Sequence, residues 1–195
     1  MRSFLILHGY QGSGPQHWQT WLAGRLRRAG ERVSYPPLPS PDAPDLAAWR
    51  AALEAELRAL PDEPVVLCHS LACILWLHHC AQPVLEGGRA ERVLLVAPPS
   101  EAGAPRAIRP FFPVPEHADA AAVAAAAGAT ELVCAADDPY CPEGAATVYG
   151  APLGLATHVV DGGGHVNVEA GFGPWPEVEA WALGRGDGLG SEERR

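Results

Sequence analysis

The sequence predicts an α/β protein with a mostly parallel sheet of about six strands and helices on both faces. Short apolar runs alternate with longer amphipathic segments along the chain, which is typical of β-α-β units. The run at residues 65–68 is apolar throughout, as strands covered on both faces are. With 195 residues, the chain is long enough for one domain with a sizeable core and too short for two.

The first elements follow one another closely. Residues 4–7 form an uninterrupted apolar run, which indicates a buried strand. Residues 18–28 are predicted to be helical because four side chains have helical spacing: Trp18, Trp21, Leu22 and Arg25. Residues 32–35 form a second predicted strand, and the proline-rich stretch 36–44 ends it.

A second helix and the central strand come next. Asp45 is a suitable N-cap for a helix with one apolar face, made of Leu46, Trp49, Leu53, Leu57 and Leu60. The apolar strand 65–68 then leads through Ser70 into a helix that we expect to end near Cys80. The alternation therefore continues through the centre of the chain.

The last third of the chain completes the pattern. Strands are predicted at 92–97, 130–135 and 156–160, and a final helix at 174–183 with proline in its first turn. The connection 98–117 is long and proline-rich, and we expect a small flap over the sheet edge there. We therefore predict a single domain at 1–184, followed by a disordered tail at 185–195 that is rich in glycine and charge.

The composition disfavours several classes of function. The net charge of −9 disfavours binding to nucleic acid and to anionic membranes. All 14 basic residues are arginine, so no lysine can form a Schiff base or act as a general base. The N-terminal apolar run is too short for a signal peptide, and the five cysteines contain no Cys-x-x-Cys pair. We expect a cytoplasmic protein with reduced thiols and no metal site.

The junction after the central strand is a candidate nucleophile turn. A buried strand meets a helix at Ser70, and small side chains, Cys68 and Ala72, lie two residues before and after it. This is how a nucleophile elbow is built, although glycine usually occupies the two small positions. The amide of Leu71, at the start of the helix, could stabilise an oxyanion. The alternative interpretation is that Ser70 only caps a helix.

A serine nucleophile needs a base, and His165 is the best candidate. It follows three consecutive glycines directly after the last predicted strand, where catalytic side chains gather in open α/β sheets. His117 lies in the long connection and His158 inside a strand pattern, so neither has a comparable position. The alternative for His165 is an ordinary surface loop residue.

The orienting acid is expected after the preceding strand. Asp137 and Asp138 both stand at the end of the strand predicted at 130–135, before a turn. We favour Asp138 because its spacing to Pro142 fits the usual pattern after this strand, with Asp137 as the second choice.

The glycine-rich loop after the first strand should supply a second oxyanion donor. We choose the amide of Tyr10, with that of Gln11 next. Neither a dinucleotide fingerprint nor a P-loop motif is present in this loop, so no cofactor is expected.

These segments together resemble the small serine hydrolase family typified by retinoblastoma-binding protein 9. The match runs from about Phe4 to Trp181 and is most specific in Gly164-His165-Val166-Asn167 and the Gly-Phe-Gly-Pro-Trp-Pro block at 171–176. The resemblance implies a three-layer α/β-hydrolase fold without a large cap domain, and a triad of Ser70, Asp138 and His165. The Leu-x-Cys-x-Glu motif linked to the human member's protein partner is absent.

An open, shallow site for a small-molecule acyl substrate is therefore expected. Pocket candidates are Gln11, His69, Phe111, Phe112 and Tyr140. Trp18 and Trp175 are assigned to core packing, and Asn167 could brace the His165 loop.

The leading hypothesis is a carboxylesterase-like serine hydrolase that cleaves small esters, or thioesters or amides, through an acyl-enzyme. One alternative is a non-catalytic or weakly active binding protein with a hydrolase fold. Cys68 and Ala72, at positions where glycine is usual, are the reason to consider it. Another is a cysteine-dependent hydrolase using Cys68 or Cys141, neither of which lies at the apex of a strand–helix turn.

Overall fold

The computed structural model describes residues 1–82, 88–185 and 189, and this part of the chain contains an open sheet of six strands. All five neighbouring pairs are parallel, in the order β2-β1-β3-β4-β5-β6. The prediction of a mostly parallel sheet is confirmed, and the predicted strand positions agree to within one residue. The strands are β1 (Ser3–Leu7), β2 (Arg32–Ser34), β3 (Val65–His69), β4 (Arg92–Val96), β5 (Thr130–Cys134) and β6 (Ala156–Val159).

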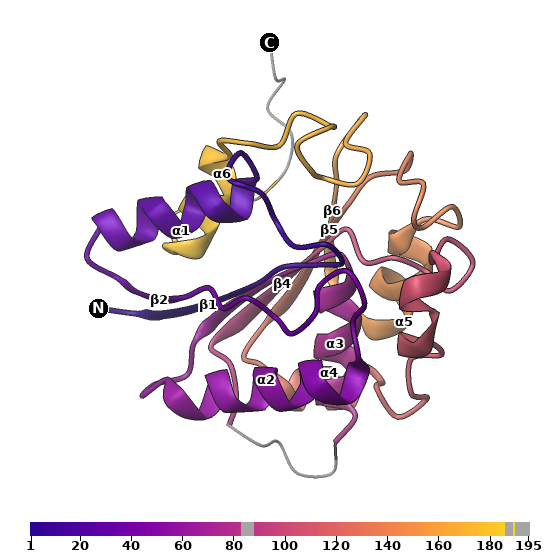
Figure 1. Ribbon diagram of the computed structural model, residues 1–195, viewed down its shortest axis with the longest axis horizontal. Helices are drawn as coiled ribbons and strands as arrows, with labels where there is room; N and C mark the ends of the chain where they lie inside the picture. The colour runs from indigo at the N-terminus through magenta and orange to yellow at the C-terminus, as the bar shows by residue number, and fades with distance from the viewer. Residues whose placement is uncertain (83–87, 186–188, 190–195) are drawn as a thin grey trace.

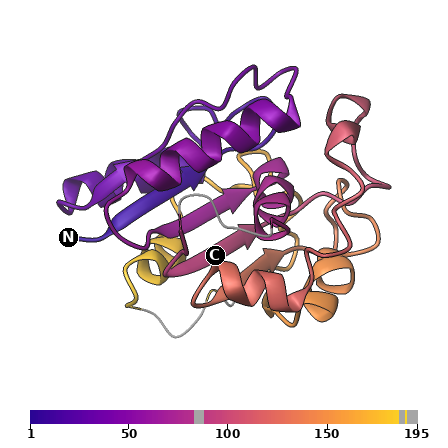
Figure 2. The ribbon, with the colours of Figure 1, turned by 90° about the horizontal axis from the view of Figure 1, so that it is seen from below.

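Helices cover both faces of this sheet, so the molecule has three layers (Figures 1 and 2). One face carries the first and last helices, and the other carries the second, third and fourth. The helices are α1 (Trp18–Arg28), α2 (Leu46–Ala59), α3 (Leu71–Cys80), α4 (Ala120–Ala126), α5 (Ala151–Leu153) and α6 (Pro176–Ala182), with a 3-10 turn at Arg106–Phe111 and a π-helical turn at Ala146–Gly150.

The core explains why the central strand is apolar on both sides. In β3, Val65 and Leu67 pack toward α1 and α6, while Val66 and Cys68 pack toward α2 and α3. All four side chains are fully buried. Burying a side chain of this kind contributes about 1.5–3 kcal/mol, so the two-sided pattern is a direct consequence of the three layers.

The strand order places a crevice at the carboxyl ends of β1 and β3. These two strands are neighbours, but β1 leads to α1 on one face of the sheet and β3 leads to α3 on the other. Loops that leave in opposite directions open a space between them, and ligands bind at such switch points in open α/β sheets.

Two local predictions need correction. The final helix begins at Pro176 and not at residue 174, because Trp175 has a non-helical backbone (φ −135°, ψ 84°). The connection 98–117 is also more tightly packed than a flap, since it contains the 3-10 turn and buries Ile108 and Phe111.

The predicted disordered tail at 185–195 lies outside the described residues, except for two positions. Arg185 donates a backbone hydrogen bond to the Ala180 carbonyl, and Leu189 is buried with the α1–α6 cluster. No helix in the described part of the chain has the length and apolar character needed to cross a membrane.

Candidate active site

Ser70 stands at the sharp turn between β3 and α3 in a strained backbone conformation. Its φ of 55° and ψ of −123° are unusual for a residue other than glycine. The amide of Ser70 donates a 2.9 Å hydrogen bond to the Val96 carbonyl at the end of β4, which holds the turn against the sheet. The strained turn and the buried strand before it match the geometry of a nucleophile elbow.

The loop after β1 comes very close to this turn at Gly9. A Cβ atom built on Gly9 would lie only 2.7 Å from the Ser70 Cβ and 3.1 Å from the His69 carbonyl oxygen. Real side chains do not tolerate such a contact, so glycine is needed here for the two loops to meet.

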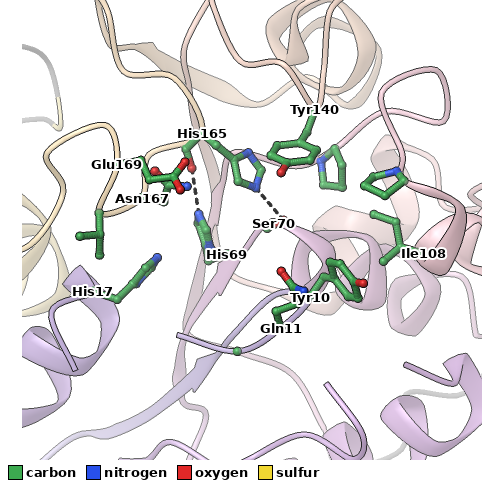
Figure 3. Close-up of a pocket in the computed structure, with 14 residues that line it drawn as sticks. Tyr10, Gln11, His17, His69, Ser70, Ile108, Tyr140, His165, Asn167 and Glu169 are labelled. Carbon is green, nitrogen blue, oxygen red and sulfur yellow. Dashed lines mark hydrogen bonds between the residues drawn. The ribbon is translucent and has the colours of Figure 1, made fainter. Parts of the chain in front are cut away.

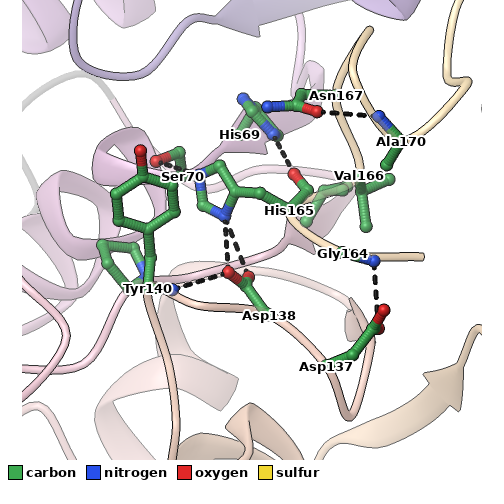
Figure 4. A network of polar contacts seen from close by, with 12 residues as sticks. His69, Ser70, Asp137, Asp138, Tyr140, Gly164, His165, Val166, Asn167 and Ala170 are labelled. Carbon is green, nitrogen blue, oxygen red and sulfur yellow. Dashed lines mark hydrogen bonds and ion pairs between the residues drawn. The ribbon is translucent and has the colours of Figure 1, made fainter. Parts of the chain in front are cut away.

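Ser70, His165 and Asp138 form one continuous line of hydrogen bonds (Figure 4). The His165 Nε2 lies 2.8 Å from the Ser70 Oγ, and its Nδ1 lies 3.0 and 2.9 Å from the two Asp138 carboxylate oxygens. Asp138 is only 2% exposed, and its Oδ1 also accepts a hydrogen bond from the Tyr140 amide. The structure thus brings together three residues that lie far apart in the sequence.

The two adjacent aspartates have different positions. Asp138 points to the His165 ring, whereas the Asp137 Oδ1 accepts a 3.0 Å hydrogen bond from the Gly164 amide. Of the two acids left open by the sequence, only Asp138 contacts the imidazole. Asp137 instead ties the end of β5 to the glycine loop that carries His165.

Further contacts hold the His165 loop. The His69 Nε2 lies 3.0 Å from the His165 carbonyl oxygen, and the Trp18 indole donates a 3.0 Å hydrogen bond to the Val166 carbonyl. Val166 has a φ of 48°, which is costly for a β-branched residue. Trp18 is buried as predicted, but it also supports this loop, and Asn167 accepts a hydrogen bond from the Ala170 amide within it.

The two expected oxyanion donors belong to residues close to Ser70, since Leu71 follows it in the chain and Tyr10 lines the same cavity. Within the described part of the chain, neither the Tyr10 amide nor the Leu71 amide has a hydrogen-bond acceptor. The Gln11 amide, the second choice in the sequence, donates to the Pro41 carbonyl at 2.9 Å and is therefore occupied. The Leu71 amide also opens a ten-residue helix, whose dipole favours negative charge.

A cavity of about 280 Å³ lies over Ser70 (Figure 3). The expected pocket residues Gln11, His69 and Tyr140 line it. The sequence analysis missed several others, although some belong to segments it singled out, namely the long connection and the loop after His165. These additional lining residues are Gly12, His17, Pro99, Pro105, Ile108, Asn167, Val168 and Glu169.

Phe111 and Phe112 do not line this cavity, so their assignment to the substrate pocket was wrong. Phe111 is fully buried and packs edge-on against Trp49, with ring centroids 5.4 Å apart. Phe112 lines a separate cavity of about 260 Å³, together with Leu77 and Leu153. The 3-10 turn explains the error, because it directs Ile108 and not the phenylalanines toward Ser70.

Two histidines in the cavity wall are held neutral by burial. Burial, followed by the proximity of His165, lowers the pKa of His17 to about 4. The same causes, again with burial first, hold the pKa of His69 well below its usual value. The rings lie in a row, with centroids 4.8 Å apart for His17 and His69 and 5.1 Å apart for His69 and His165.

The cysteines are poorly placed for catalysis. Cys68 and Cys141 are fully buried, and burial raises the pKa of Cys68 far above its usual value and that of Cys141 to about 11. A thiol needs the opposite shift to act as a nucleophile near neutral pH. Among the described residues, no group of three or more histidine, cysteine or acidic side chains could hold a metal ion.

Comparison with known proteins identifies hydrolase relatives of this chain. A family model described as serine hydrolase matches residues 4–182. The putative hydrolase YdeN of Bacillus subtilis (strain 168) is 34% identical over 68 residues, which cover 35% of this chain and 36% of that protein. The sequence match thus spans about a third of the length of this curated relative.

Solved structures extend the likeness to nearly the whole fold. The crystal structure of the ydeN gene product from B. subtilis superimposes with a TM-score of 0.78 at 21% identity, covering 95% of this chain and 98% of that one. The crystal structure of a putative hydrolase of the alpha/beta superfamily from Xanthomonas campestris pv. campestris superimposes with a TM-score of 0.60 at 19% identity. The match covers 85% of this chain and 89% of that one. Together with the open parallel sheet, these neighbours confirm the predicted α/β-hydrolase fold.

Proposed function

Because this chain belongs to the serine hydrolase family, we propose that it hydrolyses small carboxylic esters through an acyl-enzyme formed on Ser70. The observation that carries the proposal is the unbroken contact from the Ser70 Oγ through His165 to Asp138. The family match and the hydrolase relatives support hydrolase activity. The ester class and the role of each residue belong to the proposal as well.

In the first half of the reaction, the Ser70 Oγ attacks the ester carbonyl carbon while the His165 Nε2 accepts the hydroxyl proton. Asp138 holds the imidazole with its Nδ1–H toward the carboxylate and stabilises the imidazolium that forms. The carbonyl oxygen becomes an oxyanion, which the Tyr10 and Leu71 amides stabilise. The carbon–oxygen bond to the alcohol then breaks, and His165 gives its proton to the departing oxygen.

In the second half, water takes the place of the alcohol. His165 removes a proton from this water, which attacks the acyl carbon and forms a second tetrahedral intermediate. The bond to the Ser70 Oγ then breaks, His165 returns the proton to the serine, and the carboxylic acid leaves. Both halves use the same base and the same two amides, so no cofactor is required.

The second candidate is a non-catalytic binding protein with the hydrolase fold. The observation that favours it is the pair Cys68 and Ala72, which replace the usual small glycines beside Ser70. Cys68 and Ala72 are nevertheless fully buried, and the turn at Ser70 is formed. The hydrogen bonds that connect Ser70 through His165 to Asp138 therefore favour the catalytic function.

Two narrower statements remain proposals. We propose a cytoplasmic location, supported by five buried cysteines that are all unpaired. The relationship to the family members typified by retinoblastoma-binding protein 9 also stays a prediction, supported by the motifs around Ser70 and His165.

A fluorophosphonate probe and a p-nitrophenyl ester of a short acid test the proposed activity. The wild-type protein should be labelled on Ser70 and should release p-nitrophenol, whereas Ser70→Ala should lose labelling and at least about 10⁴-fold in kcat. Labelling that survives Ser70→Ala would reject Ser70 as the nucleophile. A labelled protein with no turnover on a panel of esters would favour the binding-protein alternative.

A further inference from the structure

His17 is a buried polar side chain in the wall of the cavity over Ser70. It is only 5% exposed, and it lines the cavity together with His69. Figure 3 shows its ring pointing from the start of α1 toward His69, and the centroids of the two rings lie 4.8 Å apart. The proposed mechanism assigns no step to His17, because the proton passes between Ser70 and His165.

One ring nitrogen of His17 is occupied by a helix cap. Its Nδ1 accepts a 3.2 Å hydrogen bond from the Gln19 amide at the start of α1. In a neutral ring whose Nδ1 is an acceptor, the proton is on Nε2. Within the described part of the chain, this Nε2 has no hydrogen-bond partner. His17 therefore presents an N–H donor at the cavity wall without an acceptor among those residues.

The position of this donor is fixed by contacts that do not involve a ligand. Gln19 is fully buried, and its side chain donates to the Leu7 carbonyl at the end of β1 and accepts from the Ser13 hydroxyl. The cap bond to Gln19 thus ties the His17 ring to the edge of the sheet. A buried donor without an acceptor is unfavourable, so a ligand oxygen that pairs with it is preferred over an apolar group of the same shape.

The neighbouring polar groups restrict the chemical class of that ligand. Asn167 also lines the cavity, and because its Oδ1 accepts from the Ala170 amide, its N–H groups are further donors. Glu169 is an exposed carboxylate on the same wall, and none of the described lining residues is an arginine, which disfavours an anionic ligand. An ammonium group cannot accept from His17. A hydroxyl group is neutral, accepts from an N–H and can also donate to a carboxylate.

We propose that the His17 Nε2–H donates a hydrogen bond to a hydroxyl group of the substrate and makes this hydrolase selective for esters that carry a free hydroxyl group. The proposal rests on the proposed ester hydrolysis at Ser70 and names its substrate class. Pairing one buried neutral donor corresponds to a preference of about tenfold in kcat/KM. His17 is then a specificity-determining residue.

Two pairs of esters with equal shape isolate the hydroxyl group. In 1-monobutyrin the hydroxyls are in the alcohol part, and in 2-methylbutyl butyrate methyl groups replace them. Butyl 3-hydroxybutyrate and butyl 3-methylbutyrate make the same exchange in the acyl part. The readout is the ratio of kcat/KM within each pair, compared between variants so that the intrinsic reactivity of the esters cancels.

His17→Asn and His17→Gln separate the donor from the helix cap. Asparagine keeps an acceptor oxygen for the Gln19 amide, but it is too short to place an N–H at the Nε2 position. Glutamine reaches the Nε2 position with an N–H and lacks the acceptor beside the helix. His17→Asn should lower the ratio in at least one pair by about tenfold, whereas His17→Gln should keep it within about threefold of the wild-type value.

Thermal unfolding should show the opposite order, with His17→Gln less stable than His17→Asn, because a lost cap destabilises the helix. His117→Asn is the matched control, since His117 is exposed and does not line the cavity. This control should leave both ratios at the wild-type value.

The outcomes separate the two proposals. Ratios that His17→Asn leaves at the wild-type value in both pairs would overturn the inference and leave the proposed function intact. A ratio that falls in His17→Gln at least as much as in His17→Asn would assign the effect to the helix cap and would also overturn it. A fall specific to His17→Asn supports the proposal, and the pair in which it occurs assigns the hydroxyl to the alcohol or the acyl part. No hydrolysis of any of the four esters, together with no fluorophosphonate labelling of Ser70, would overturn both proposals.

Discussion

Asp137 and Asp138 show how two identical neighbours take different roles after one strand. Asp138 is buried and contacts the His165 imidazole through both oxygens, while exposed Asp137 accepts a hydrogen bond from the Gly164 amide. The Asp138 carboxylate fixes which ring nitrogen carries the proton, because it must accept from Nδ1–H. For Asp137, the observed contact requires only an acceptor for the Gly164 amide.

Asp138→Asn is expected to lower kcat for ester hydrolysis by about 10³–10⁴-fold, because an amide favours the wrong imidazole tautomer. Asp137→Asn keeps an acceptor oxygen for Gly164 and should change kcat by no more than a few-fold. Steady-state kinetics of both variants on one ester provide the measurement. Equal losses in the two variants would contradict the assignment of Asp138.

At the scale of elements, the site depends on the meeting of two loops. The loop after β1 carries the Tyr10 amide, and the β3–α3 turn carries Ser70 and the Leu71 amide. Their separation is set at Gly9, where a Cβ atom would come within 2.7 Å of the Ser70 Cβ. The proposed mechanism requires the Tyr10 and Leu71 amides to face the same oxygen, so a small displacement of one loop is expected to impair oxyanion binding.

Gly9→Ala should therefore reduce kcat strongly, by about 10²-fold or more, since losing one oxyanion donor costs about that much. Gly14→Ala is the matched control, because a Cβ atom there meets nothing within 4 Å and the backbone has an ordinary φ. Circular dichroism should show both variants folded. Full activity in Gly9→Ala would contradict the prediction, because it would show that the two loops can separate without loss of kcat.

At the scale of the whole molecule, neutral histidines are buried on both sides of the sheet. Burial lowers the pKa of His17 to about 4 near α1, and the pKa of His79 to about 4 within α3, where Glu54 partly opposes the effect. In the unfolded chain both rings have a pKa near 6.5. Between pH 6.5 and 4 the unfolded state therefore binds more protons than the folded state, and acid favours unfolding.

The free energy of unfolding should be highest above pH 6.5 and should fall toward pH 4, by up to about 3 kcal/mol for each of these histidines. Guanidinium chloride titrations between pH 7.5 and 5 measure this slope. His79→Gln should make the slope shallower, whereas His117→Gln, at an exposed position, should leave it unchanged. A free energy that stays constant from pH 7.5 to 5 would contradict the prediction.

The order of elements could be predicted because it depends on local pattern. Periodicity located α1 at the residues that the structure assigns, and the aspartate before α2 forms the expected cap, accepting from the Ala48 amide at 2.8 Å. The uniform apolar run of β3 predicted its burial between two helical layers. The candidate nucleophile, base and acid could be named because each follows a strand in a parallel sheet, where the carboxyl ends share one edge.

The walls of the cavity could not be predicted, because they depend on how irregular segments fold against the sheet. A proline-rich connection has no periodicity, so the sequence did not distinguish the buried Phe111 from Ile108, which lines the cavity. Likewise, the contact of Trp18 with the Val166 carbonyl joins residues 148 positions apart. By itself, the sequence determined the strand–helix alternation and the chemical groups at the strand ends. Only the tertiary structure decided which of two aspartates reaches His165 and which side chains surround Ser70, because those choices depend on distances between segments that local pattern does not encode.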